Sequence, residues 1–179
     1  MPMEIERKFL VSDLPNNMSI IDVTLIEQAY INEAPETRVR KSFNSGQSMY
    51  SLTIKIPEGG YRMEVDVPIN SEHYKQLSDY STNKIIKNRL KYLIDLKFNL
   101  YAYLDMYMGD LYGLKTIEVE FKNEAQASSF TPPAWFGEEV THDDRYKNVN
   151  LNKKLWEVPE EPTEPETPTD PGDGGVAGE

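Results

Sequence analysis

The sequence contains no cysteine and only two histidines in 179 residues. The absence of cysteine excludes disulfide bonds, thiolate zinc sites and cysteine nucleophiles. His73 and His142 leave little room for a histidine-rich metal centre or a conventional catalytic triad, and we expect both on the surface. These two shortages exclude several common kinds of active site.

Long hydrophobic runs are also missing. No stretch approaches the ~18 consecutive apolar residues that cross a bilayer, and no basic-then-apolar leader precedes Glu4. We therefore expect a soluble, cytoplasmic protein with no membrane partner. The formal net charge of -11 argues against nonspecific nucleic-acid binding, because such binding requires a basic surface that displaces counterions.

The negative charge is concentrated at the C-terminus. Residues 158–179 hold seven acids, five prolines and four glycines, with no base and no aromatic residue. Such a segment buries too little apolar surface to offset its ordering entropy, so we expect a disordered acidic tail. The remaining residues 1–157 hold 23 acids and 19 bases, a net charge of -4. This body has the length of one compact domain.

Apolar and polar residues alternate with period two over most of the body, which predicts a mainly β protein. Turn residues at 44–46 and 57–60 are typical of hairpins. Eight strands with short connections predict a closed or nearly closed antiparallel barrel that forms a tunnel, with a few short helices outside. We expect strands at 3–11, 24–33, 36–43, 48–56, 61–68, 84–94, 97–107 and 113–122. We expect helices at 71–77 with Ser71 as the N-cap, at 124–129 and at 146–156.

The alternation separates charged residues from apolar ones. In the first strand Glu4, Glu6 and Lys8 share one face, and the apolar residues share the other. The predicted core face holds Ile5, Phe9, Val11, Val39, Ile54, Met63, Val65, Val67, Ile117, Val119 and Phe121. The charged face has two interpretations: the wet side of an open sheet, or the interior of a closed one, where buried charge must be compensated.

The distribution of sign favours the second interpretation, because acids and bases occur in separate pairs on separate strands, whereas a solvated face normally mixes them. The expected lining has eight cations, Lys8, Arg38, Arg40, Lys55, Arg62, Lys87, Arg89 and Arg145. It has six anions, Glu4, Glu6, Glu64, Asp66, Glu118 and Glu120. Converging guanidinium and ammonium groups suit consecutive phosphates, and carboxylate pairs suit hard divalent cations. The combination indicates metal-assisted phosphoryl chemistry on a polyphosphate.

Several segments resemble the triphosphate tunnel metalloenzymes, also called the CYTH superfamily. Glu4-Ile5-Glu6-Arg7-Lys8 matches the ExExK signature of that family at the N-terminus. Further segments resemble family motifs in order: 28–30, 38–40, 53–55, 62–66, 87–89, Asp105, 109–114, 118–120 and 141–146. Together they cover essentially the whole predicted body.

The resemblance implies roles for individual residues. A divalent metal, Mg²⁺ or Mn²⁺, would be held by Glu4, Glu6, Glu118 and Glu120, with Glu64 and Asp66 serving a second metal and the attacking water. Lys8, Glu64 and Asp66 are the expected catalytic residues. The expected substrate-binding residues are Lys8, Arg38, Arg40, Lys55, Arg62, Lys87, Arg89 and Arg145. Asp66 departs from the glutamate more usual in the family, so its metal contact is expected to run through water.

The expected activity is metal-dependent hydrolysis of inorganic triphosphate to phosphate and pyrophosphate, by a monomer or homodimer. The alternatives within the family are hydrolysis of thiamine triphosphate or a nucleoside triphosphate, and cyclisation of ATP as in class IV adenylate cyclases. An alternative of another class is a noncatalytic polyphosphate or nucleotide sensor. Tyr101, Tyr103, Tyr107 and Tyr112 are expected to pack the barrel or its rim rather than to stack on a base.

Overall fold

The structure is a computed structural model that describes residues 5–16, 19–58, 61–95 and 99–152. The predicted acidic tail at 158–179 lies outside the described residues. The eight expected strands are present: β1 (Ile5–Leu10), β2 (Ile20–Glu33), β3 (Glu36–Asn44), β4 (Gln47–Glu58), β5 (Tyr61–Pro68), β6 (Asn83–Asp95), β7 (Leu100–Tyr107) and β8 (Lys115–Phe121). The helices are α1 (Ser71–Tyr80), α2 (Glu124–Ser129) and α3 (Asn148–Leu151), with 3₁₀ turns at Gly109–Leu111 and Asp144–Tyr146.

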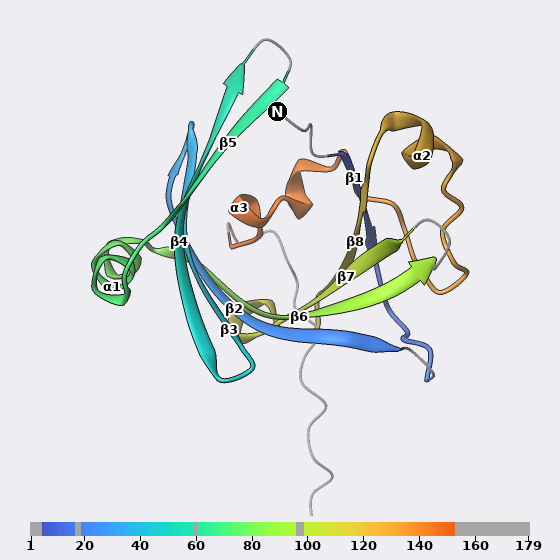
Figure 1. The fold of residues 1–179 in the computed structure, drawn as a ribbon, viewed down its shortest axis with the longest axis horizontal. Coiled ribbons are helices and arrows are strands. Elements are labelled where there is room, and N and C mark those ends of the chain that lie inside the picture. The colour runs from blue at the N-terminus through green and yellow to red at the C-terminus, as the bar shows by residue number, and fades with distance from the viewer. Residues whose placement is uncertain (1–4, 17–18, 59–60, 96–98, 153–179) are drawn as a thin grey trace, which may run out of the picture.

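All eight strands join one antiparallel sheet in the order β1-β8-β7-β6-β2-β3-β4-β5. The sheet curls so that its two end strands approach from opposite sides of an enclosed space (Figure 1). Among the described residues, β1 and β5 do not pair with each other. The predicted antiparallel eight-stranded sheet is confirmed, and the pairing records a curled sheet rather than a closed barrel.

The β3–β4 hairpin forms as its turn residues predict. Asn44 and Gln47 are the last paired residues of the two strands, so Ser45 and Gly46 form a two-residue connection. Both have positive φ, 48° and 81°, as a type I′ turn requires. This turn fixes the register that places alternate residues of β3 on the inner face of the sheet.

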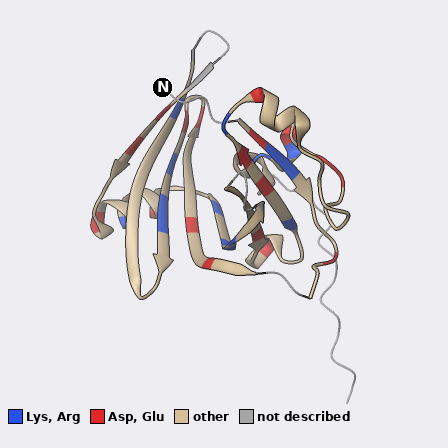
Figure 2. Ribbon diagram, turned by 45° about the vertical axis from the view of Figure 1, so that its right-hand side comes forward, with Lys and Arg blue, Asp and Glu red and all other residues tan. Residues whose placement is uncertain are grey.

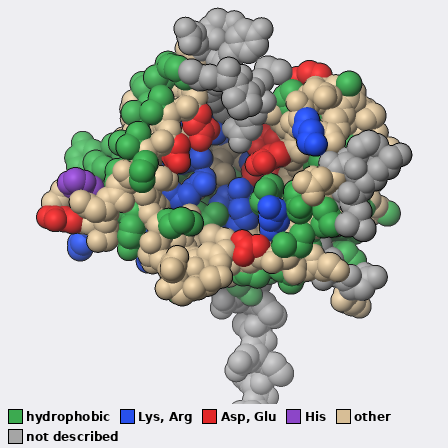
Figure 3. All heavy atoms as spheres, in the orientation of Figure 1, with side chains coloured by type: hydrophobic (Ala, Val, Ile, Leu, Met, Phe, Trp, Pro, Cys, Tyr) green, Lys and Arg blue, Asp and Glu red, His purple; other side chains and the backbone are tan. Residues whose placement is uncertain are grey.

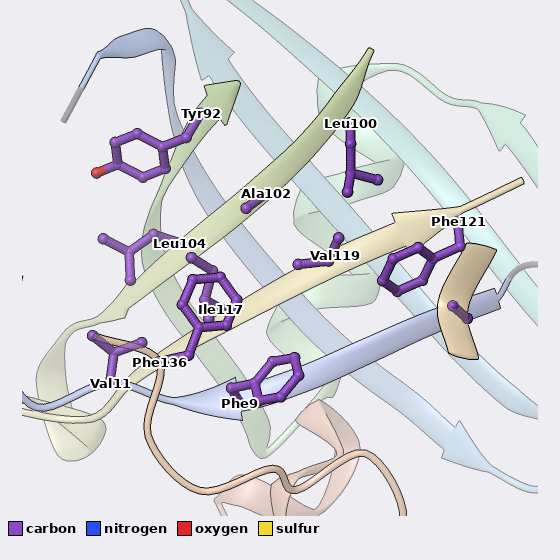
Figure 4. Close-up of a cluster of buried hydrophobic side chains, with 11 residues drawn as sticks. Phe9, Val11, Tyr92, Leu100, Ala102, Leu104, Ile117, Val119, Phe121 and Phe136 are labelled. Atoms are coloured by element: carbon purple, nitrogen blue, oxygen red, sulfur yellow. The ribbon is translucent and has the colours of Figure 1, made fainter. Parts of the chain in front are cut away.

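The main apolar cluster covers the outer face of β1, β7 and β8 (Figure 4). Phe9, Ile117 and Val119 are almost fully buried there, beneath α2 and the segment that follows it. The complete cluster is Phe9, Val11, Tyr92, Leu100, Ala102, Leu104, Ile117, Val119, Phe121, Ala127 and Phe136. Because burial of each large side chain contributes about 1.5–3 kcal/mol, this cluster holds firmly the wall of the sheet that carries β1 and β8.

The predicted core face was wrong on β5. Val65 and Val67 point to the outer face but are 38% and 45% exposed. The reason is the reach of α1, which packs mainly on β2, β3 and β4 and places Tyr74 against Tyr50, with ring centroids 5.3 Å apart. The outer face of the last strand therefore stays open, although its pattern is that of a half-buried strand.

The helices differ from expectation in two places. The N-cap of α1 is Asn70 rather than Ser71, and its side chain accepts a hydrogen bond of 2.8 Å from the backbone N–H of His73. The helix predicted over 146–156 is instead a 3₁₀ turn followed by the single turn α3, and Lys147 between them has extended backbone. Residues 153–156 lie outside the described part. No helix in the described ranges is long and apolar enough to span a membrane.

The C-terminal segment 144–152 enters the space that the sheet encloses (Figure 1). Val149 and Leu151 form a second buried cluster with Tyr30, Ile85 and Tyr107. Those three partners lie on β2, β6 and β7, and their side chains occupy the inner face. This segment therefore provides an apolar floor on the inner face of the sheet.

Candidate active site

Charged residues lie on strands at both sides of the enclosed space (Figure 2), and the strand pairing directs many of their side chains to the inner face of the sheet. In the space-filling view, Lys and Arg side chains gather around a hollow at the centre of the molecule, with acids beside them (Figure 3). We call this space, lined by the inward residues of the eight strands, the hollow. Its lining is built by strand alternation, as the sequence predicts.

Asp105 on β7 is a fully enclosed charge of the hollow, with no exposed surface. Its Oδ2 accepts a hydrogen bond of 2.6 Å from Nζ of Lys87, which is also fully buried. Its two oxygens accept bonds of 2.7 Å each from Nε and Nη2 of Arg89. One carboxylate thus fixes two of the cations expected to bind phosphate.

Glu118 on β8 continues this chain of ion pairs. Its Oε2 lies 2.6 Å from Nη2 of Arg89, and its Oε1 lies 2.8 Å from Nζ of Lys8. The Lys8 ammonium also donates to the backbone carbonyl of Tyr146 at 3.2 Å. The described structure therefore contains a continuous chain in the order Lys87, Asp105, Arg89, Glu118 and Lys8.

These contacts shift the protonation equilibria of the chain. Burial alone would raise the pKa of Glu118, but the Lys8 ammonium and the Arg89 guanidinium outweigh it and hold the pKa well below its ordinary value. The pKa of Asp105 is likewise lowered, because Arg89 and Lys87 outweigh burial. Burial lowers the pKa of Lys87 to about 8, with Asp105 opposing the shift. Both carboxylates are therefore charged at neutral pH, and Lys87 is still mostly protonated there.

The opposite wall carries two arginines of β3. Arg38 is 8% exposed and lies 3.8 Å from Oε1 of Glu36. Burial, together with the positive charges of Arg38 and Arg89, lowers the pKa of Arg40 to about 10. The Nε atoms of Arg38 and Arg40 are buried and have no hydrogen-bond partner among the described residues. Buried donors of this kind fit an anionic ligand between the walls.

Lys55, Glu64 and Asp66 meet on the inner face of β4 and β5. Lys55 Nζ lies 3.1 Å from Oε2 of Glu64, and these two residues are directly paired across the strands. Asp66 accepts a hydrogen bond of 2.7 Å from the hydroxyl of Thr53. The two carboxylates are thus placed on the same inner face, two residues apart along β5.

The acids of β1 and β8 also meet as expected. Glu6 is directly paired with Glu120, next to the pair of Lys8 with Glu118, and both Glu6 and Glu120 are exposed. Like charges in directly opposed positions are destabilising, so a cation between them is favourable. Within the described ranges no three histidine or acidic side chains already converge as a metal site. Glu4 lies outside the described residues.

Two of the expected phosphate ligands are not placed with this group. Arg145 has a side chain that is 64% exposed and pairs with Asp143 at 2.6 Å. Arg62 has its backbone in β5, but its side chain lies outside the described part. The cations that the structure brings around the hollow are Lys8, Arg38, Arg40, Lys55, Lys87 and Arg89.

The sequence reasoning gave no individual role to Asp105 or Gln28, which it named only within motifs. Asp105 holds Lys87 and Arg89, although it was expected only as part of a motif. Gln28 donates to the Tyr30 hydroxyl at 2.6 Å, and its own Oε1 is buried without a partner among the described residues. Asp105 is directly paired with Arg89, so both side chains point inward. Strand alternation alone gives the face of Asp105 relative to its own strand, but not this pairing.

Two tyrosines at the inner face of β7 contact cations rather than one another. Lys91 Nζ lies 4.1 Å from the ring centroid of Tyr101 and 5.8 Å from that of Tyr103. The Arg89 guanidinium lies 5.4 Å from the ring of Tyr103. Cations within about 6 Å of a ring face are attracted by it, so these rings already have partners.

No family model matches the chain, but comparison with known proteins finds similar enzymes in both sequence and structure. A protein of Nitrosomonas europaea named inorganic triphosphatase is 33% identical over 148 residues, which cover 83% of this chain and 95% of that protein. A protein of Acetivibrio thermocellus with the same name is 32% identical over 159 residues, covering 86% and 95%. A solved structure of an inorganic triphosphatase has a TM-score of 0.61 and 32% identity, covering 84% of this chain and 95% of that one.

Proposed function

This chain belongs to the CYTH family of triphosphate tunnel metalloenzymes, and on that premise we propose that it hydrolyses inorganic triphosphate to phosphate and pyrophosphate. The observation that carries the proposal is the buried chain of ion pairs from Lys87 to Lys8. Such a chain fixes cations in advance of the substrate, and phosphoryl transfer depends mainly on positioning and charge neutralisation.

The substrate would lie in the hollow between the two walls of cations. Arg89 and Lys87 approach it from β6, and Arg38 and Arg40 from β3, with Lys8 and Lys55 at its sides. The buried Nε atoms of Arg38 and Arg40 supply donors that the described residues leave unused. Arg62 belongs to the same proposed set, whereas Arg145 would first have to leave Asp143. Around such a substrate the curled sheet would act as a tunnel.

The acids of the hollow fit a hard divalent cation, because their donors are carboxylate oxygens. Glu6, Glu118 and Glu120 would hold Mg²⁺ or Mn²⁺ together with Glu4, and the opposition of Glu6 to Glu120 favours a cation there. Glu64 would contribute to a second metal. Bound metal would neutralise phosphate oxygens and so stabilise the charge that develops during transfer.

The reaction needs no covalent nucleophile of the protein. Glu64 and Asp66 would accept hydrogen bonds from a water and orient it toward the terminal phosphorus. A bond forms between that phosphorus and the water oxygen, while the bond from the phosphorus to the bridging oxygen breaks. The bridging oxygen keeps the electron pair and leaves as part of pyrophosphate. The proton of the water passes to solvent, and Lys8, beside Glu118, would stabilise the charge on the transferred phosphate.

The contacts of the tyrosines favour an inorganic substrate over an organic one. Thiamine and nucleotide bases need an aromatic or apolar face to stack upon, but Tyr101 and Tyr103 have Lys91 and Arg89 against their rings. An organic group would therefore meet rings that already have a cation in contact. Inorganic triphosphate has no such group and gains from every cation of the lining.

The test is to measure release of orthophosphate from inorganic triphosphate with Mg²⁺, with Mn²⁺ and with EDTA. Thiamine triphosphate and ATP at the same concentration are the comparison substrates. We expect metal-dependent release, with one pyrophosphate per orthophosphate, and at least tenfold slower reaction of the organic substrates. Tight binding of triphosphate without release under any metal would contradict the proposal and support a noncatalytic sensor instead.

A further inference from the structure

We propose that Tyr107 is a positioning residue for Lys87: its ring holds the buried ammonium against Asp105, and the C-terminal segment fixes the ring through Asn148. The inference rests on the proposed binding of triphosphate in the hollow. It gives the C-terminal segment a role in the site, although no residue of α3 belongs to the chain of ion pairs.

The sheet register brings the two residues together. Lys87 and Tyr107 are directly paired across β6 and β7, so both side chains leave the same face of the sheet. The Lys87 ammonium lies 5.4 Å from the centroid of the Tyr107 ring and 2.6 Å from Asp105 Oδ2. The ammonium is therefore held between a ring and a carboxylate, and it has no exposed surface.

The hydroxyl of Tyr107 fixes the ring. It donates a hydrogen bond of 2.6 Å to Oδ1 of Asn148 and lies 3.5 Å from the hydroxyl of Thr116. Tyr107 is 3% exposed and packs with Leu111, Val149 and Leu151. The ring thus packs against the C-terminal segment and is hydrogen-bonded to it, so the position of the ring depends on where that segment lies.

The C-terminal segment is itself fastened to three strands around the hollow. Lys8 on β1 donates to the carbonyl of Tyr146 at 3.2 Å, and Asn83 on β6 donates to that of Val149 at 2.8 Å. With the bond from Tyr107 on β7, these contacts hold the segment from separate directions. The position of the segment therefore affects Lys87 through the hydrogen bond of Asn148 with Tyr107 and the contact of the Tyr107 ring with the Lys87 ammonium.

The support of the ring matters because the pKa of Lys87, about 8, lies only about one unit above neutral pH. Burial lowers the pKa of Lys87 to about 8; Asp105 and Glu118 oppose the shift, and Arg89 adds to it. The face of an aromatic ring attracts a cation, more strongly when the pair is desolvated. The ring therefore keeps the proton on a lysine whose charge the substrate needs.

The test measures the dissociation constant of inorganic triphosphate by calorimetry, without metal, from pH 6 to pH 10. In the wild type, binding should weaken as pH rises through about 8, where Lys87 loses its proton. Tyr107→Leu removes the ring, and we expect the weakening to move about one pH unit lower, which corresponds to about tenfold weaker binding at pH 9. Tyr107→Phe keeps the ring, and we expect the pH at which binding weakens to stay near that of the wild type.

Two further variants complete the design. Asn148→Ala removes the partner of the hydroxyl at a part-exposed position, and we expect about threefold weaker binding. Tyr112→Leu is the matched control, because Tyr112 is 52% exposed and should bind as the wild type does. Thermal unfolding identifies any variant that fails to fold; Tyr107→Met then replaces Tyr107→Leu as the ring-free variant.

An unchanged pH dependence in folded Tyr107→Leu or Tyr107→Met would overturn the inference, as would equal effects of the Leu and Phe variants. Because binding rather than turnover is measured, the result stands apart from the proposed reaction. A wild type that binds triphosphate but does not hydrolyse it would refute the proposed activity, while a shifted pH dependence in Tyr107→Leu would still support the role of Tyr107.

Discussion

The ammonium of Lys8 lies 2.8 Å from Oε1 of Glu118, its direct cross-strand partner. One of these residues is proposed to hold phosphate and the other metal, so each neutralises the other before either ligand binds. A metal on Glu118 would weaken its hold on Lys8 and Arg89 and free both for phosphate. Metal and triphosphate should therefore bind more tightly together than separately.

Glu118→Gln tests the metal-binding role, with thermal unfolding measured beside turnover because Glu118 also pairs with Lys8 and Arg89. The amide keeps the size of the side chain but loses the charge that a metal ligand requires, and we expect turnover of triphosphate to fall at least about a hundredfold. Steady-state phosphate release with Mg²⁺ and Mn²⁺ provides the measurement. Glu139→Gln is the control, because Glu139 pairs with Arg7 outside the hollow; near-normal turnover in Glu118→Gln would refute the metal site.

Asp105→Asn should destabilise the protein strongly. The change leaves Lys87 and Arg89 without their shared anion in a buried position, and removing one partner of a buried ion pair costs about 3–5 kcal/mol. Urea unfolding measures the loss. Triphosphate supplies the missing negative charge, so it should raise the midpoint more in the variant than in the wild type; a variant as stable as the wild type without ligand would contradict the buried network.

Acid should destabilise the fold through the same two carboxylates. The folded pKa values of Asp105 and Glu118 lie below their ordinary values, so their stabilisation is complete above about pH 5 and is lost as pH falls through the folded values. The free energy of unfolding should therefore decrease from pH 5 to pH 3. Asp105→Asn should show a shallower decrease, and parallel curves for the two proteins would show that Asp105 does not contribute.

Asn70→Ala should weaken α1 by removing its N-cap, at a cost of about 1 kcal/mol. Ser71→Ala provides the matched control, because the sequence predicts Ser71 as the cap whereas the structure gives that bond to Asn70. Equilibrium unfolding of the two variants distinguishes the assignments. A larger loss in Ser71→Ala would restore the sequence-based assignment.

Strand alternation was sufficient to predict most of the fold and the residues that face the hollow. It placed Lys8, Arg38 and Lys87 correctly, since the period of a strand fixes the face of each residue. Alternation does not give the pairing of strands, and the role of Asp105 depends on its position opposite Arg89 in the register of β6 with β7. That register is a tertiary property.

The remaining differences have local physical causes. Asn70 and Ser71 are both good N-caps, and the choice between them depends on where the chain leaves β5. Val67 is exposed because α1 packs mainly on β2, β3 and β4. The alternation of apolar residues does not predict which strands a helix covers. The C-terminal helix begins at Asn148 rather than at Tyr146 because Lys147 adopts extended backbone between two turns.

The place of β2 in the sheet has a consequence for how the chain folds. β2 is hydrogen-bonded to β3, its neighbour along the chain, and to β6, which is far from it in sequence. The pairing of β2 with β6 joins the hairpins of β2–β5 to the strands of the other wall, and it brings Arg40 toward Arg89. Long-range pairing is slow because chain entropy is lost before the contact forms, and here like charges also repel. We therefore expect β2 and β6 to pair late in folding, and to pair faster when a multivalent anion is present during refolding.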